Sequence, residues 1–214
     1  MKTLTSAKQL VLLALVIVAL VGPEAARSAI LRVGDCGPAV SSLQRRLAAA
    51  RFPSGGVDGC YGPATRYAVV AVQLAHRLRP DGVAGARTQA ALRKPLPFAA
   101  RSRARGTHVE VSLGRQVLAI VRDGRIVSVY ATSTGKRGYE TPRGTYRVYR
   151  KEIAGWSRQY GVPLPWVSYF HRGYAVHAGT IPGYPASHGC VRVPTPFAPS
   201  IYRRMPNGSS VVVY

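Results

Sequence analysis

Ser-His-Gly-Cys-Val-Arg at residues 187–192 decides the fold of the second half of this chain, and His177 precedes it with nine residues between. Glycine immediately before Cys190 permits a tight turn, which can aim backbone N–H groups at a developing oxyanion. The apolar run at 173–176 predicts a strand that ends at His177, so its ring projects from a rigid edge. A thiol on a turn beside an imidazole on a strand end is the arrangement that a cysteine nucleophile requires.

The residues around this stretch have the pattern of strands. Apolar residues alternate at 109–113, and two apolar runs at 116–121 and 126–131 flank an Asp-Gly turn signal, which predicts a hairpin. The run at 211–214 predicts a closing, buried strand. Residues 107–214 are therefore predicted to form a mostly β domain, either a sandwich or an open barrel.

The first part of the chain, residues 29–93, has a helical pattern instead. Apolar residues at helical spacing run over 40–47, and a second helix is predicted to begin near Pro63. The motif Asp-Gly-x-x-Gly-x-x-Thr begins at Asp58 and again 23 residues later at Asp81. Because Asp-Gly favours turns, the motif predicts two similar loops in a three-helix domain.

These patterns give an α+β, multidomain fold class: a small three-helix N-terminal domain followed by a mostly β domain. The segment between the two, residues 94–106, is rich in Pro and Arg and lacks apolar periodicity. It is predicted to be an extended, charged linker.

The N-terminus has the features of a secretory signal peptide over residues 1–28. A basic leader precedes an apolar run at 10–21, and Ala-Arg-Ser at 26–28 offers small residues at a cleavage site. The run is shorter than the ~20 residues that a spanning helix needs, which favours cleavage over a retained anchor. We expect a secreted protein of the cell wall, or a periplasmic one if the cell has an outer membrane.

The chain contains three cysteines, an odd number that leaves one thiol over in an oxidising compartment. Cys36 and Cys60 each lie in a loop just before a predicted helix. A disulfide between them would pin two helix starts together in a domain too small to be stable from its core alone. Cys190 would then be the free thiol.

The net charge of +22 predicts attraction to polyanions of any kind. Export would take the protein away from chromosomal DNA, so we expect no nucleic acid among its partners. Neither a basic amphipathic helix nor a nucleic-acid recognition motif supports a membrane-active or nucleic-acid-binding function. Anionic wall polymers remain a candidate partner.

Both halves resemble families of cell-wall proteins. The cysteine stretch, together with Thr-Ser-Thr-Gly-Lys at 132–136 and Thr-Pro-x-Gly-Thr-Tyr at 141–146, resembles the L,D-transpeptidase catalytic domain of the YkuD type. Residues 31–92, with their two Asp-Gly loops, resemble a small peptidoglycan-binding domain. The resemblance implies peptidoglycan stem peptides and glycan as partners, with no cofactor and no metal.

The resemblance also implies roles for individual residues. Cys190 attacks a donor stem peptide, His177 takes the thiol proton, and the carbonyl of Ala178 orients the imidazole. His188 and Gly189 belong with Cys190 to the turn whose amides form the oxyanion hole. Three further residues are expected to contact the substrate: Arg192, Ser187 and Tyr169.

The implied reaction is a transpeptidation that forms 3→3 crosslinks through a cysteine thioester. An L,D-carboxypeptidase that trims stem tetrapeptides and a non-catalytic wall-binding protein are the alternatives. A zinc site at His171, His177, His188 and Cys190 fits no standard ligand spacing. Ser187 has no acidic partner placed by the sequence, so a serine triad is not supported.

Overall fold

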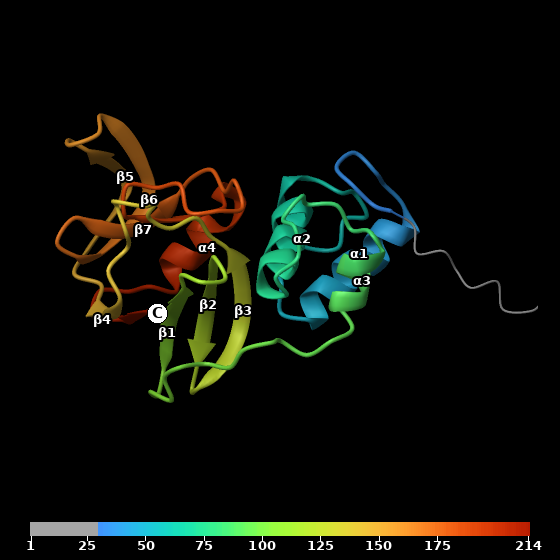
Figure 1. The fold of residues 1–214 in the computed structure, drawn as a ribbon, viewed down its shortest axis with the longest axis horizontal. Coiled ribbons are helices and arrows are strands. Elements are labelled where there is room, and N and C mark those ends of the chain that lie inside the picture. The colour runs from blue at the N-terminus through green and yellow to red at the C-terminus, as the bar shows by residue number, and fades with distance from the viewer. Residues whose placement is uncertain (1–29) are drawn as a thin grey trace, which may run out of the picture.

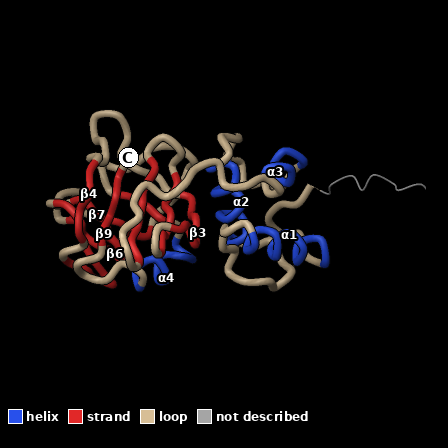
Figure 2. The backbone as a smooth tube through the Cα atoms, turned by 90° about the horizontal axis from the view of Figure 1, so that it is seen from below, coloured by secondary structure: helices blue, strands red, loops and turns tan. Residues whose placement is uncertain are grey.

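The computed structural model describes residues 30–214, and the predicted signal peptide lies outside the described residues. Figure 1 shows two parts side by side along the long axis: helices α1–α3 in one, and the strands with α4 in the other. Figure 2 shows the same separation from a second direction. This confirms the predicted α+β fold class. Within residues 30–214, every helix is too short or too polar to span a bilayer.

The helical part contains α1 (Pro38–Ala49), α2 (Pro63–Ala75) and α3 (Ala86–Ala91). The first two helices each begin with proline at the first helical position, where the missing N–H would have no helical partner anyway. Residues 68–75 of α2 are all buried, because this helix lies between the other helices and the β part.

Each Asp-Gly loop is organised by a buried glutamine from the helix before it. In the first loop, Gln44 Nε2 donates to Asp58 Oδ1 at 2.7 Å and to Thr65 Oγ1 at 3.0 Å. The Gly59 N–H donates back to Gln44 Oε1 at 2.9 Å. Because both the nitrogen and the oxygen of the Gln44 amide form hydrogen bonds, the loop is held to α1 and neither buried atom is left without a partner.

The second loop repeats this network. Gln73 Nε2 donates to Asp81 Oδ1 at 2.7 Å and to Thr88 Oγ1 at 3.1 Å, and the Gly82 N–H donates to Gln73 Oε1 at 2.9 Å. The repeat seen in the sequence is therefore a repeat of hydrogen bonds as well as of turn residues.

The disulfide joins Cys36 to Cys60, as predicted, and it leaves Cys190 as the free cysteine. It links the start of α1 to the loop before α2, with a sequence separation of 24. In the chain-entropy treatment, a loop of this size stabilises the folded state by about 3.5 kcal/mol.

The β part consists of two sheets within the described residues. The first has the strand order β3-β2-β1-β9-β4 and the second β5-β6-β7-β8. The first sheet is formed by β1 (Thr107–Ser112), β2 (Val117–Arg122), β3 (Arg125–Ala131), β4 (Gly144–Arg147) and β9 (Ser210–Val213). The second is formed by β5 (Arg150–Ser157), β6 (Val162–His171), β7 (Tyr174–Ala178) and β8 (Val191–Val193).

The predicted hairpin and closing strand are both present. Strands β2 and β3 pair antiparallel across Asp123 and Gly124, which both have positive φ, the conformation that a two-residue hairpin turn requires. Strand β9 pairs parallel with β1 and antiparallel with β4. It therefore lies inside the first sheet.

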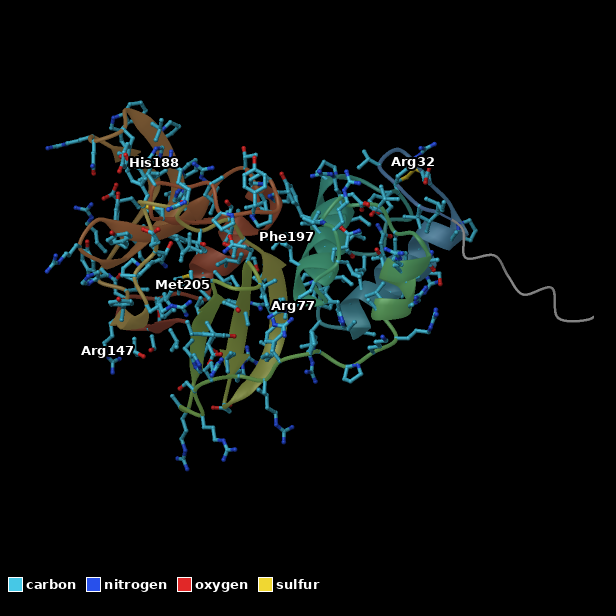
Figure 3. The ribbon with its side chains drawn as sticks, viewed as in Figure 1. Arg32, Arg77, Arg147, His188, Phe197 and Met205 are labelled. Carbon is cyan, nitrogen blue, oxygen red and sulfur yellow. A yellow bond between two sulfur atoms is a disulfide. The ribbon has the colours of Figure 1, made fainter. Side chains whose placement is uncertain are left out.

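The core of the β part lies between the two sheets. Apolar residues of β1, β2 and β9 face those of β7 and β8 there. The short helices η1 (Thr195–Phe197) and α4 (Ala198–Arg203) add Phe197 and Ile201 to this core, and Met205 follows them (Figure 3). These helices carry the chain from β8 back to β9.

The outer face of the first sheet is covered by the helical part. Residues Val117, Ala119 and Val129 of β2 and β3 belong to the same apolar core as α2. Polar contacts reinforce this packing: the Val129 N–H donates to the Arg51 carbonyl at 2.8 Å, and Arg115 donates to the Ala75 carbonyl at 2.6 Å. The two parts thus share one continuous apolar interface.

The Pro- and Arg-rich segment predicted as a linker contains no helix or strand, and it runs from α3 to β1 (Figure 1). Its Leu96 and Phe98 pack against the core of the helical part. Beyond them, the backbone N–H groups of Arg101 and Ser102 donate to the buried Glu110 carboxylate of β1 at 2.8–3.0 Å. The segment is therefore fixed to the β part at its second half.

Candidate active site

The register between β7 and β8 places the predicted catalytic side chains on one face of the second sheet. The strands run parallel, with Val176 beside Val191 and His177 beside Arg192. Both valines point into the core between the sheets. Because side chains alternate along a strand, His177, Arg192 and Cys190 lie on the opposite face. The structure thus brings these three predicted residues together.

His177 is held in one tautomer and one orientation. Its side chain is 7% exposed, and its Nδ1 lies 2.7 Å from the carbonyl oxygen of Ala178. A carbonyl oxygen can only accept, so Nδ1 carries the proton and Nε2 is left as an acceptor. Burial lowers the pKa of His177 to about 4, and the positive charge of Arg192 adds to this effect. The imidazole is therefore neutral near neutral pH.

The Cys190 thiol is partly exposed, and Cys190 lies immediately before β8. Burial raises its pKa, against smaller opposing effects of the Ala175 backbone and Arg192. In this conformation, Sγ donates to the Gly173 carbonyl at 3.9 Å. Among the hydrogen bonds of residues 30–214, none joins the thiol to the His177 ring. The resting site thus contains a neutral thiol beside a neutral imidazole.

The turn at 187–190 is rigid because its polar groups bond one another. Ser187 Oγ accepts from the Gly189 N–H at 3.0 Å and donates to the Cys190 carbonyl at 2.5 Å. From another segment, Thr141 Oγ1 donates to the Gly189 carbonyl at 2.6 Å. Gly189 has φ +114°, and a Cβ there would lie 2.5 Å from the Tyr174 ring. Only glycine fits this position without displacing its neighbours.

Because of these hydrogen bonds, Ser187 and Gly189 have structural roles that differ from the predicted ones. Ser187, expected to bind substrate, is 1% exposed and its hydroxyl is fully engaged within the turn. Gly189, expected to supply an oxyanion-hole amide, already donates that amide to Ser187. The N–H groups of His188 and Cys190 donate to no acceptor within residues 30–214. They are the two donors that the turn leaves available.

Three side chains from outside the turn hold the His188 ring, whose position Figure 3 marks. Lys136 Nζ donates to its Nε2 at 3.2 Å, Tyr160 stacks on it at 4.7 Å, and Tyr139 meets it edge-on at 4.8 Å. These contacts fix the turn from outside. Sequence spacing does not predict the two tyrosine contacts, whereas Lys136 lies in the Thr-Ser-Thr-Gly-Lys motif at 132–136.

The two other predicted substrate residues differ in exposure. Arg192 is partly exposed, and the guanidinium has no hydrogen-bond or ion-pair partner among the described residues. Its backbone is fixed by Ser133, whose carbonyl accepts the Arg192 N–H at 2.9 Å. Tyr169 is only 5% exposed, packs in a cluster with Cys190, and lies under the Arg150 guanidinium at 4.2 Å. Tyr169 thus supports the thiol and offers little surface to a substrate.

The thiol and the imidazole are the chemically active groups of this site. Across residues 30–214, no three His, Cys, Asp or Glu side chains are grouped so that they could hold a metal ion. What the arrangement can do is proton transfer and nucleophilic attack by sulfur on a carbonyl.

Comparison with known families agrees with this geometry. The model of the L,D-transpeptidase catalytic domain, YkuD, matches residues 106–213, half of the chain. The chain belongs to the L,D-transpeptidase family. A second model, described as "Putative peptidoglycan binding domain", matches residues 36–92, which include α1–α3.

Solved structures of this L,D-transpeptidase family resemble the whole described chain. An L,D-transpeptidase from Xylanimonas cellulosilytica is 38% identical with a TM-score of 0.78, covering 86% of this chain and 97% of that one. An L,D-transpeptidase from Stackebrandtia nassauensis is 26% identical with a TM-score of 0.55, covering 86% and 94%.

Two curated relatives each match one part of the chain. The "Putative L,D-transpeptidase YkuD" of Bacillus subtilis is 26% identical over 111 residues, 50% of this chain and 65% of that protein. A "Probable N-acetylmuramoyl-L-alanine amidase" of Bacillus licheniformis is 45% identical over 65 residues, 29% of this chain. The chain spans only 18% of the amidase, so the likeness concerns a single shared segment.

Proposed function

We propose that this family member is a peptidoglycan L,D-transpeptidase that forms 3→3 crosslinks through a thioester on Cys190. The observation that carries the proposal is the common face of β7 and β8, where a free thiol and an imidazole with an unprotonated Nε2 lie together. Family membership supports the reaction class.

In the first step, Cys190 Sγ attacks the carbonyl carbon of the third residue of a donor tetrapeptide, and its proton passes to His177 Nε2. The thiol must first turn from Gly173 toward the ring; catalytic hydrogen bonds are often loose before substrate binds. Since both groups are neutral at rest, the proton moves during the attack, with His177 as general base.

The attack turns the carbonyl oxygen into an oxyanion, which the free N–H groups of His188 and Cys190 would bind. Removing one such donor from an enzyme typically costs a factor of about 10²–10³ in rate. Collapse of the intermediate breaks the bond to the terminal D-alanine. His177 Nε2–H protonates the leaving amine, and the donor remains on Cys190 as a thioester.

In the second step, the side-chain amine of the third residue of a neighbouring stem attacks the thioester. His177 Nε2 takes a proton from this amine and returns it to the departing sulfur. One amide bond has been exchanged for another, so no cofactor or energy source is consumed. The unpartnered Arg192 guanidinium is suited to hold a substrate carboxylate beside this face.

We also propose that the chain acts outside the cytoplasm, as its predicted signal peptide implies. The Cys36–Cys60 disulfide supports this, because such bonds persist in oxidising compartments.

Mass spectrometry of muropeptides tests the proposal. Incubation of purified peptidoglycan with the protein should yield 3→3 crosslinked dimers, and a Cys190→Ala variant should yield none. Shortened monomers without dimers would identify the reaction as hydrolysis by a carboxypeptidase. Equal products with and without Cys190 would overturn the enzymatic assignment.

A further inference from the structure

The helical part carries two hollows that correspond to each other through its internal repeat. One, of about 430 Å³, lies against the loop before the first Asp-Gly, at residues 53–57 and Ala64. The other, of about 450 Å³, lies against the loop before the second Asp-Gly, at residues 77–79 and Arg87. Ala64 and Arg87 occupy matching positions, 23 residues apart. The repeat has therefore produced two similar grooves.

The first groove is bounded on one side by the catalytic part. Its far wall is formed by Tyr130 of β3 and by Phe197, Ser200 and Arg204 of the η1–α4 region. Ala64 also packs against the core of the β part. This groove therefore lies at the boundary between the two parts of the chain.

The second groove is lined by residues of the helical part alone, and it differs in chemistry. Arg77, Arg79 and Arg87 are exposed around it, and Leu78 and Val83 give it an apolar side. No carboxylate pairs with these arginines within residues 30–214. Unpaired arginines are common in a chain with 30 basic and 8 acidic residues, so the three matter because they surround a groove.

One carboxylate also lines the groove, that of Asp81. Its Oδ1 accepts from Gln73 Nε2 at 2.7 Å and from the Val83 N–H at 2.9 Å, so it is committed to the loop network. The three arginines therefore leave the groove with an excess of positive charge. Arginine binds carboxylates through paired N–H groups, and an apolar wall suits the carbon atoms of a sugar or peptide.

The groove also lies next to the loop that connects the two halves of the active site. Pro80, between Arg79 and Asp81 of the groove, touches Gly183: a Cβ at Gly183 would lie 2.5 Å from the Pro80 ring. Gly183 belongs to the loop between His177 and the turn that carries Cys190. A polymer held in the groove would therefore lie beside the segment that flanks the catalytic site.

We propose that the groove formed by Arg77, Arg79, Arg87, Leu78 and Val83 is a second substrate subsite, which binds a carboxylate-bearing stem of the peptidoglycan beside the loop that contains Gly183. The proposal rests on the proposed function for its polymer. It is also supported by the peptidoglycan-binding family model, whose match at residues 36–92 includes the groove.

A charge-matched pair of variants tests this subsite. The groove variant combines Arg77→Gln, Arg79→Gln and Arg87→Gln in the full chain. The control variant combines Arg45→Gln, Arg93→Gln and Arg105→Gln, which are exposed and outside both grooves. Both lose three positive charges, so the general field of the protein falls equally. Both also carry Cys190→Ala, so that the wall material is not altered during binding.

The measurement is binding to purified peptidoglycan from which phosphate polymers have been removed. The groove variant should bind about tenfold more weakly, which is the loss of affinity expected when three partly exposed charge pairs are removed together. The control variant should stay within about twofold of the parent. Amidation of the stem carboxylates should lower binding by the unmutated groove to the level of the groove variant. Thermal unfolding of both variants should match that of the parent chain.

Equal losses in both variants would overturn the proposal, because binding would then depend on net charge alone. A loss seen only when phosphate polymers are left on the wall would also overturn it and identify those polymers as the ligand. Acyl transfer to a soluble tetrapeptide is measured separately in the chain with Cys190 intact. If the parent lacks this activity, the proposed function fails, whereas the binding result still decides the subsite.

Discussion

His177 donates its Nδ1 proton to the backbone carbonyl of Ala178, the residue that follows it, across 2.7 Å. This bond uses the strand itself to orient the ring, and no carboxylate side chain is needed as a third member. A carbonyl is a weaker partner than a carboxylate and does not stabilise an imidazolium by charge. The lowered pKa of His177, caused chiefly by burial, agrees with a base that is neutral at rest.

The decrease of the acylation rate at low pH should reflect the pKa of His177. Because the pKa of His177 is lowered to about 4, the ring stays able to accept a proton as the pH falls from 7 to 5. We expect the rate of acylation, followed by intact-protein mass, to fall with a midpoint near pH 4. A midpoint near pH 6.5, the ordinary value for histidine, would contradict the buried, neutral base.

The free protein should react slowly with a neutral alkylating reagent. Burial raises the pKa of Cys190, so little thiolate exists at pH 7. Iodoacetamide should therefore label Cys190 more slowly at pH 7 than it labels a small free thiol, and the rate should rise with increasing pH. Fast labelling at pH 7 that is lost in a His177→Ala variant would instead reveal a preformed thiolate–imidazolium pair.

Removal of the Ser187 hydroxyl should loosen the catalytic turn. In Ser187→Ala, the Gly189 N–H loses its acceptor, which costs about 1–3 kcal/mol of stability if that group stays buried. We expect acylation to slow by about tenfold or more, since the neighbouring oxyanion donors lose their fixed positions.

Ser168→Ala provides the matched control for this variant. Ser168 is also a buried serine near the site, but its Oγ has no hydrogen-bond partner within residues 30–214. Its removal should leave the acylation rate unchanged and should not lower the melting temperature. Equal effects of the two substitutions would show that the hydrogen bonds of Ser187 have no special role.

The resistance of the second half of the linker to proteolysis should depend on Glu110. In Glu110→Gln, the carboxylate that accepts from Arg101 and Ser102 is replaced by an amide with one acceptor oxygen. Trypsin should then cleave after Arg103 and Arg105 several-fold faster. Glu140→Gln, which alters an exposed carboxylate bonded only within its own turn, should leave the cleavage rate unchanged. Unchanged cleavage in both would mean that apolar packing alone fixes the linker.

Much of the fold could be predicted from local sequence signals. The Asp-Gly hairpin at 122–125 follows from turn chemistry, and it is present. The closing strand, predicted at 211–214 from its apolar run, is present at Ser210–Val213. The glutamines that organise the repeated loops could not be predicted in the same way. Gln44 lies 14 residues from Asp58, and a glutamine in a helix is usually read as part of a solvated face.

The sequence predicts which residues form the site better than it predicts what each residue does there. Cys190, His177 and Arg192 are brought to one face, because strand register follows from the same apolar pattern that predicts the strands. The roles of Ser187 and Tyr169 depend on which partner each side chain meets. Those partners lie in the turn itself or on other strands, at distances that sequence spacing does not give.

If the Cys190 sulfur carries the acyl group during the reaction, the covalent intermediate can be trapped on it. The full chain is mixed with a carbapenem or with a tetrapeptide donor that lacks an acceptor, and its intact mass and peptide map are measured. We expect one covalent adduct, on the peptide that contains Cys190, and none in Cys190→Ala. An unmodified Cys190 after this exposure, or an adduct that persists in Cys190→Ala, would contradict it.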